Sequence, residues 1–295
     1  MRFTGNMRSI LAMLLAVVFF SCMDAMLKVL AGAYPPLQVT ALRGLTAVPW
    51  VLGYVLWRRQ LGLVFSRHLR WRLHLLRGLI GVLMMALFIF GLQTLGLAEA
   101  YTLSFVAPLL ITLLAVPVLQ EAALPRHWVA LAVGLCGVVI ALRPDQDAFF
   151  NLGSVAVLAS AVCYALSTVL GRLISRTEPS VTLVFWTTFS MTVGGSVLGA
   201  ADWVEIRAVH WPVLLGLGVT GTLAQLCVTE AFRHGQASAI APFEYSALIW
   251  AVAFDWLIWR AVPDAYTLTG GAVIIASGLY LIRREAPRGV VVLPP

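Results

Sequence analysis

The sequence predicts an all-α polytopic membrane protein with ten transmembrane helices, arranged as two inverted five-helix repeats with both termini in the cytoplasm. Composition is the first reason: of 295 residues, 61% are hydrophobic and 11% are charged, and the mean hydropathy is +0.92. A soluble domain carries about a quarter of its residues as charged groups, so the lipid bilayer has to serve as the apolar solvent. The other two reasons are ten long apolar runs and an uneven placement of basic residues.

Each of the ten apolar runs has the length, about 17–25 residues, that a helix needs to cross the hydrocarbon core. Turn residues or charges separate the runs, and most connections are only a few residues long, so successive helices must be antiparallel neighbours. The runs cover residues 8–31, 36–57, 74–94, 97–120, 126–143, 151–173, 180–200, 209–231, 236–259 and 264–282.

The first run could be misread as a signal peptide, because Arg2 and Arg8 precede its apolar residues. Phe19 and Phe20 are too bulky for a cleavage site, and the apolar run continues to Leu30. Both features favour a retained first span. The four cysteines lie singly inside apolar segments, which favours packing residues over disulfides or metal ligands.

Basic residues predict the orientation of the chain. With a cytoplasmic N-terminus, the inner segments hold fifteen of the 20 Lys and Arg residues, and the outer segments hold only Arg143, Arg207 and Arg260. Lys and Arg are in excess in cytoplasmic loops, so both termini should lie in the cytoplasm. The net charge of +7 therefore reflects membrane topology, and no nucleic-acid partner is expected.

Weak internal similarity divides the chain into a first repeat, residues 8–143, and a second repeat, residues 151–282, followed by a cytoplasmic tail, residues 283–295. Five spans per half is an odd number, so the second half is inserted in the opposite orientation, and binding sites in such folds lie near the midplane. The matching positions are Gly78 with Gly216, Leu119 with Leu257 and Pro125 with Pro263 at an offset of 138, and Lys28 with Arg172 and Pro35 with Pro179 at an offset of 144.

Four short motifs fall at helix starts and bends: Gly78-Leu-Ile-Gly81, Ala98-Glu-Ala100, Ala107-Pro108 and Ala241-Pro242. With the segments 19–44 and 241–259, they resemble the drug/metabolite transporter superfamily and, within it, the EamA family, including its YddG-type amino-acid exporters. The resemblance covers residues 8–282.

This resemblance implies a fold of five plus five helices with a central cavity lined mainly by spans 1, 3, 4, 6, 8 and 9. It also implies alternating access without ATP in the bacterial inner membrane. Family members export amino acids, or move riboflavin, nucleotide-like metabolites and drugs. The expected partners are a small-molecule solute and the lipid bilayer, and the sequence is compatible with a monomer.

Charged residues inside the spans are the first candidates for function. Asp24 and Lys28 are four residues apart in span 1, the favourable order for an intrahelical ion pair. Arg43 lies about two turns into span 2 at a similar depth. These three residues could tie spans 1 and 2 together, or Asp24 could hold a solute amine or a proton while Arg43 holds a carboxylate. Asp255 and Arg260 are near span ends and are expected to reach the interface.

Glu244 is a sharper candidate, because it lies several turns inside span 9 with no opposite charge nearby in sequence. A carboxylate at that depth is costly, so it often marks a proton or substrate pathway. Glu244 could carry a proton or bind a solute ammonium group. The alternative is a helix–helix hydrogen bond to Gln225 or Tyr245.

The predicted cavity lining is rich in aromatic side chains and sulfur, which suits an amphipathic solute with an apolar side chain. Neutral polar side chains are interspersed. Most aromatic side chains in spans only pack against neighbours or face lipid. The predicted lining comprises Met84, Met85, Phe88, Tyr101, Tyr164, Phe243, Tyr245 and Trp250, with Ser104, Ser167, Thr222 and Gln225.

Prolines and glycines inside the spans are candidate hinges. Pro108 and Pro242 each remove a backbone hydrogen bond and bend a helix. Small residues could equally serve close helix packing, as the Gly195–Gly199 spacing suggests. The glycine candidates, all in spans 3 and 8, are Gly78, Gly81, Gly216, Gly218 and Gly221.

No enzyme motif emerges. The five histidines lie in or beside loops without ligand spacing, and the sequence has no metalloprotease, nucleophile-elbow or phosphate-loop signature. We therefore expect no catalytic residues, no metal and no cofactor. A membrane-embedded enzyme or a channel is the less favoured alternative to a carrier, and uptake or exchange of a larger metabolite is the alternative to amino-acid export.

Overall fold

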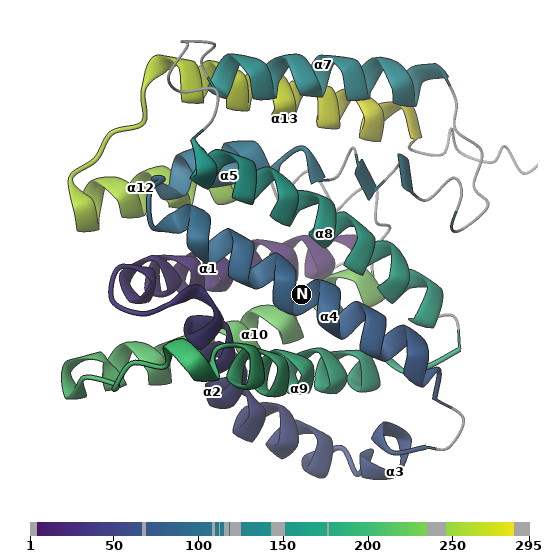
Figure 1. Cartoon of the computed structure of the whole chain (residues 1–295). Helices are drawn as coiled ribbons and strands as arrows, with labels where there is room; N and C mark the ends of the chain where they lie inside the picture. Colours follow the sequence, from purple (N-terminus) through teal and green to yellow (C-terminus); the bar gives the residue numbers. More distant parts are fainter. Residues whose placement is uncertain are drawn as a thin grey trace, which may run out of the picture.

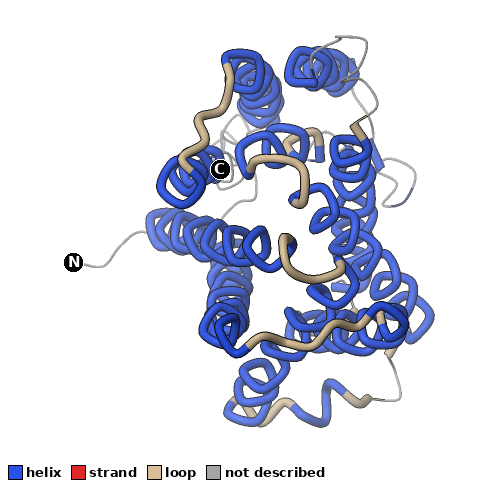
Figure 2. The backbone as a smooth tube through the Cα atoms, turned by 60° about the vertical axis from the view of Figure 1, so that its left-hand side comes forward, coloured by secondary structure: helices blue, strands red, loops and turns tan. Residues whose placement is uncertain are grey.

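The computed structural model describes residues 5–66, 69–107, 110–111, 113–114, 118, 125–142, 151–175, 177–234 and 246–285. Within these ranges, the regular elements are all helices (Figures 1 and 2). They are α1 (Gly5–Ala31), α2 (Pro36–Trp57), α3 (Leu61–Val64), α4 (Trp71–Leu92), α5 (Leu97–Ser104), α7 (Pro125–Leu142), α8 (Leu152–Ser175), α9 (Ser180–Leu198), the 3-10 turns η1 (Ala200–Asp202) and η2 (Ala208–His210), α10 (Trp211–His234), α12 (Ala247–Trp259) and α13 (Ala265–Glu285).

The helices coincide closely with the predicted apolar runs, because prolines and charges mark their ends. Helix α2 begins at Pro36 and α9 begins directly after Pro179, where proline costs no helical hydrogen bond. In the fourth run, helix α5 ends at Ser104, and helical residues are described again at 107, 110–111, 113–114 and 118.

Six helices in the described part are long and apolar enough to cross a bilayer, and α12 and α13 contribute shorter apolar segments. Their outer surface also fits lipid. On α4, Leu75, Leu79 and Leu83 are 63%, 63% and 53% exposed at a spacing of four residues. An apolar stripe of this kind is rare on a soluble monomer. The chain is therefore a multi-pass membrane protein, while the count of ten spans and the location of the termini stay predictions.

The helices pack mainly as pairs that join the two halves of the chain. Helix α1 packs against α10, α4 against α8, α2 against α9, and α7 against α13. Figure 1 shows α7 and α13 at the top of the molecule, and α2 and α9 near the bottom. A continuous buried cluster connects most of these helices, with Leu27, Ile89 and Leu217 among its members.

The crossing of α2 and α9 depends on glycine. A Cβ atom added to Gly195 would lie 2.6 Å from Ala41 N, and one added to Gly199 would lie 3.1 Å from Leu37 Cβ. Gly44 on α2 would meet Thr192 N at 2.6 Å. The Gly195–Gly199 spacing is thus a helix-packing motif, as predicted, and the two backbones approach closely because side chains are missing.

The glycines proposed as hinges also face tight neighbours. A Cβ atom on Gly78 would lie 2.7 Å from Ser190 Cβ, and one on Gly218 would lie 2.7 Å from Thr46 C. The corresponding distances are 2.8 Å from Gly216 to Met26 Cε and 3.1 Å from Gly221 to Met23 Sδ, while Gly81 has ordinary contacts. Helices α4 and α10 run through all five positions. Close packing accounts for four of these glycines, and a hinge role stays a prediction.

We predict that Gly195→Ala destabilises the protein by about 1–3 kcal/mol, because its methyl group would overpack the α2 backbone. Gly53→Ala on α2 is the matched control, since a Cβ there has no neighbour within 4 Å. It should be neutral or stabilising by about 0.5–1 kcal/mol through helix propensity. Thermal unfolding in detergent measures both. Equal melting temperatures for the two variants would contradict the close crossing.

Candidate functional site

A cavity of about 350 Å³ lies between α2, α4, α9 and α10. It is enclosed by the C-terminal half of α2, the start of α4, the N-terminal half of α9 and the middle of α10. Its described lining residues are Arg43, Gly44, Ala47, Val51, Tyr54, Arg58, Gln60, Arg77, Pro179, Val181, Val184, Thr187, Thr188, Met191, Leu217, Gly221, Thr222, Gln225 and Leu226.

The described charged side chains that line this cavity are all positive. Arg43, Arg58 and Arg77 contribute three guanidinium groups, and none of the described lining residues is acidic. The remaining polar groups are neutral hydroxyl and amide groups, such as those of Thr222 and Gln225. Such a lining can hold an anionic group and hydrogen-bond a second polar group.

Arg43 is held by sulfur atoms. Its Nη1 atom lies 2.9 Å from Met191 Sδ on α9, and its Nε atom lies 3.4 Å from Met23 Sδ on α1. Thioether sulfur is a weak acceptor, so these contacts fix the side chain without neutralising it. Asp24 lies within electrostatic range on α1, and its Oδ2 atom accepts a hydrogen bond of 2.5 Å from Tyr101 Oη.

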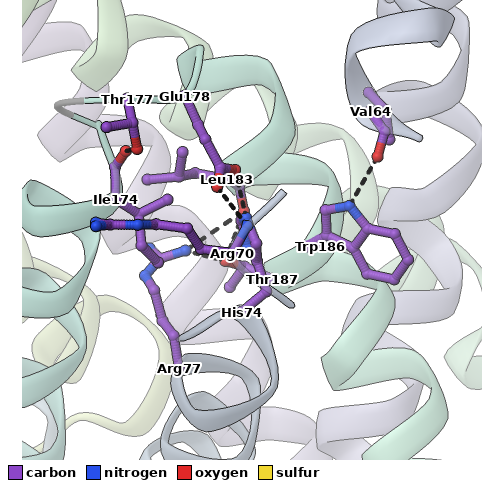
Figure 3. A network of polar contacts seen from close by, with 10 residues as sticks. All are labelled: Val64, Arg70, His74, Arg77, Ile174, Thr177, Glu178, Leu183, Trp186 and Thr187. Atoms are coloured by element: carbon purple, nitrogen blue, oxygen red, sulfur yellow. Dashed lines mark hydrogen bonds and ion pairs between the residues drawn. The ribbon is translucent and has the colours of Figure 1, made fainter. Parts of the chain in front are cut away.

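Arg77 is held by oxygen atoms instead (Figure 3). Its Nε atom donates to Ser167 O at 3.1 Å, and its Nη1 atom donates to Leu183 O at 3.4 Å and to Thr187 Oγ1. The acceptors belong to α8 and α9, so Arg77 ties α4 to both helices. Sequence reasoning assigned Arg77 only to the basic cytoplasmic flank, although it lies inside the apolar run that begins at residue 74.

A second polar group lies at the same end of the molecule. Glu178, in the turn between α8 and α9, accepts a hydrogen bond from Arg70 N at 2.8 Å, and its Oε2 atom lies 2.6 Å from His74 Nε2 (Figure 3). His74 is only 3% exposed. Because α4 begins at Trp71, three residues before the predicted span, His74 is inside the helix rather than in a loop.

The opposite end of the molecule is joined by an ion pair between α1 and α12. Lys28 Nζ lies 2.7 Å from Asp255 Oδ1 and 4.2 Å from the centre of the Trp259 ring. Asp255 Oδ2 accepts a hydrogen bond of 2.9 Å from Ala98 N at the start of α5. Lys28 thus contacts Asp255 in place of the predicted i, i+4 partner Asp24.

The prediction that Asp255 reaches the membrane interface is wrong, because the residue is 2% exposed. Its carboxylate has two partners from other helices, and these contacts offset the desolvation cost of burying the charge. Arg260 is exposed, as expected, and lies over the Trp256 ring.

Further contacts join Tyr34 and Gln38, which follow α1, to the segment between α9 and α10. Tyr34 Oη shares a hydrogen bond of 2.7 Å with His210 Nδ1 and accepts one of 2.9 Å from Arg207 N. Gln38 makes two hydrogen bonds with the Val204 backbone, at 2.6 and 2.9 Å. We call these contacts, together with the Lys28–Asp255 pair, the outer closure. Each joins the first half of the chain to the second.

The predicted lining residues fall into several groups. Gln225 and Thr222 line the cavity, as do Arg43 and the candidate hinge Gly221. The others are distributed as follows: Tyr101, Met85 and Ser167 are buried, Met84, Phe88 and Ser104 are partly buried, Tyr164 is 44% exposed and Trp250 is 38% exposed. Pro108, Pro242, Phe243, Glu244 and Tyr245 lie outside the described residues.

The helices around the described cavity differ from those that the resemblance implied. Spans 2, 3, 7 and 8 line it, rather than spans 1, 3, 4, 6, 8 and 9. Sequence reasoning missed Thr187, Thr188 and Met191, because a threonine or methionine in an apolar helix carries no signal that distinguishes a cavity from packing. The role of the remaining predicted lining residues stays a prediction.

Comparisons with known proteins agree over nearly the whole chain. The pseudopaline exporter of Pseudomonas aeruginosa (strain UCBPP-PA14) is 30% identical over 94% of this chain and 96% of its own length. The S-adenosylmethionine uptake transporter of Rickettsia bellii is 28% identical over 92% of both chains, and the riboflavin transporter of Rhizobium johnstonii is 28% identical over 78% of this chain and 76% of its own length.

A solved crystal structure has the same fold, with a TM-score of 0.63 at 19% identity over 97% of this chain and 100% of the other. Residues 7–143 and 151–284 each match the EamA-like transporter family. The chain therefore belongs to the EamA-like transporter family, and it is a multi-pass membrane transporter rather than an enzyme.

Proposed function

We propose that this protein is a secondary carrier that exports amino acids or similar small amphipathic metabolites across the bacterial inner membrane by alternating access. One observation carries the proposal. The cavity lies between helices of both halves, and the outer closure joins the same two halves at the opposite end of the molecule. A carrier in one of its two access states has this arrangement.

The helix pairing supports an inverted repeat. If span 1 corresponds to span 6, 2 to 7, 3 to 8 and 4 to 9, then the α1–α10 contact becomes the α8–α4 contact. In the same way, α2–α10 becomes α9–α4, and α1–α12 becomes α8–α5. Two halves that pack by the same contacts give a carrier two near-equivalent arrangements of one chain.

The open end of the cavity has basic residues around it. Arg58, Gln60 and Pro179 line that end. Arg59 and Arg70 lie on the connection between α2 and α4, and Arg72 lies in the first turn of α4. The excess of basic residues predicts that this side is cytoplasmic. The cavity then faces the cytoplasm, where an exporter collects its solute, and one relative is named an exporter.

The cavity volume favours a small solute. About 350 Å³ is at the lower end of the roughly 300–1,000 Å³ that small-molecule sites occupy. The alternative is uptake or exchange of a larger metabolite such as riboflavin or a nucleotide-like solute. The names of two relatives, an S-adenosylmethionine uptake transporter and a riboflavin transporter, favour that alternative.

A counterflow screen tests the proposal. Purified protein in proteoliposomes, preloaded with each of the common L-amino acids in turn, should exchange labelled for unlabelled solute with at least one of them. Liposomes loaded with riboflavin or S-adenosylmethionine test the alternative. Exchange of these larger solutes alone would replace amino-acid export by the second function. Conductance without counterflow would indicate a channel and overturn the carrier.

The direction of access is testable with a cysteine. In a variant whose native cysteines are replaced by alanine, Thr222→Cys should react with a membrane-impermeant thiol reagent in inside-out vesicles, because Thr222 lines the cavity. Ser160→Cys is the control: Ser160 is 5% exposed and its Oγ donates to Met84 O, so it should stay unlabelled. Faster labelling of Thr222→Cys in right-side-out vesicles would place the open end on the other side.

The outer closure should hold the carrier in this state. Asp255→Asn keeps an oxygen for Ala98 N but removes the charge that pairs with Lys28. Breaking a buried ion pair costs about 3–5 kcal/mol, so this variant should populate the opposite access state more. We expect labelling of Thr222→Cys from the cytoplasmic side to slow by about threefold or more. The control is Asp202→Asn in the exposed turn η1, and equal labelling rates in the two variants would exclude a closing role for the pair.

A further inference from the structure

The guanidinium group of Arg43 is charged, but its hydrogen-bond acceptors are weak. Among the described residues, its side chain donates to two thioether sulfurs, Met23 Sδ and Met191 Sδ. A guanidinium group has five N–H donors and prefers two parallel bonds to a carboxylate. Arg43 therefore lines the cavity with donor capacity that its protein neighbours do not use well.

The other two cavity arginines differ from Arg43. Arg77 already donates to three oxygen atoms of α8 and α9, so it belongs to the scaffold. Arg58 is exposed at the end of α2, where water solvates its charge. Arg43 lies deeper in the bilayer, and a charge there is stable only with a partner.

Asp24 is near Arg43 but does not bond it. The two side chains interact electrostatically, whereas the hydrogen bond that the Asp24 carboxylate accepts among the described residues comes from Tyr101 Oη at 2.5 Å. No described residue that lines the cavity supplies a second carboxylate. A carboxylate that enters with the solute would supply the missing negative charge at the place where Arg43 can bond it twice.

The hydroxyl groups in the cavity offer the opposite chemistry. Thr188 Oγ1 donates to Val184 O at 2.9 Å, and Thr222 Oγ1 donates to Gly218 O at 2.8 Å. Each hydroxyl proton is thus used within its own helix, and the oxygen lone pairs remain as acceptors. An ammonium group, which has only donors, is the natural partner for such oxygens.

We propose that Arg43 binds the carboxylate of the solute while the hydroxyl oxygens of Thr188 and Thr222 accept hydrogen bonds from its ammonium group. The substrate class is then zwitterionic α-amino acids and their conjugates. The inference rests on the proposed function, because it takes this cavity as the solute site. In this assignment Arg43 and Asp24 have different roles: Arg43 binds the solute, and Asp24 stays hydrogen-bonded to Tyr101.

Binding to the purified full-length protein tests the assignment. Thermal stabilisation in detergent is measured for each common L-amino acid and for its α-amide, which keeps the ammonium group and loses the carboxylate. The wild type should bind its preferred amino acid at least about 10-fold more tightly than the amide, because a charge-assisted bidentate bond is lost. Arg43→Gln should bind acid and amide within about twofold of each other.

Two further variants guard against a folding artefact. Arg43→Lys keeps the charge but loses the planar fork, so its affinity for the acid should lie between those of the wild type and Arg43→Gln. Arg72→Gln removes an exposed charge from α4 outside the cavity lining and should leave the preference for the acid unchanged. Loss of that preference in Arg72→Gln would assign it to net charge and overturn the role of Arg43.

The outcomes distinguish the inference from the function on which it rests. Acid and amide that bind the wild type equally, or an undiminished preference in Arg43→Gln, would overturn the inference and leave the carrier intact. Absence of amino-acid binding combined with exchange of riboflavin alone, which has no α-amino-acid group, would do the same. Absence of exchange with every solute would overturn the proposed function and the inference together.

Discussion

The ion pair between Lys28 and Asp255 is a buried charged contact that joins the two halves of the chain. In a medium of low dielectric constant, unpaired charges are costly and paired charges attract strongly. Lys28 belongs to the first half and Asp255 to the second, 227 residues away. The same carboxylate also bonds the start of α5. In the alternating-access mechanism that we propose, both charges are paired while this end is closed, so the ion pair would stabilise one access state without fixing the chain in it.

The cavity at the other end is formed because neighbouring helices meet at unequal distances. Gly195 and Gly199 let α9 approach the backbone of α2 closely near the outer closure. Toward the opposite end, the N-terminal half of α9 carries Val184, Thr187 and other side chains that line the cavity. In the alternating-access mechanism that we propose, this tight crossing is the contact about which the two halves would tilt.

The span positions were readable from the sequence because the signals for them are local. Helix α2, for example, occupies the predicted range 36–57, since a proline pair and an arginine pair mark its ends. The partner of Lys28 was not readable, because Asp24 lies on the same helix at a favourable spacing and nothing local indicates Asp255. Cavity lining was hard for a similar reason: the described cavity is lined by Thr187, Thr188 and Met191, and nothing local distinguishes these residues from others that only pack.

In the carrier that we propose, Arg43 would connect solute binding to the change of access state. Sealing both ends around an empty cavity would remove this guanidinium from water, with Asp24 as the one nearby carboxylate among the described residues, which is unfavourable in a low-dielectric medium. Sealing both ends around a zwitterion would add an ion pair at Arg43 and hydrogen bonds between the ammonium group and the threonine oxygens. A carrier built this way crosses its occluded state more readily when loaded. The sulfur contacts with Met23 and Met191 suit this role, because they position the guanidinium group without competing with the solute for its charge.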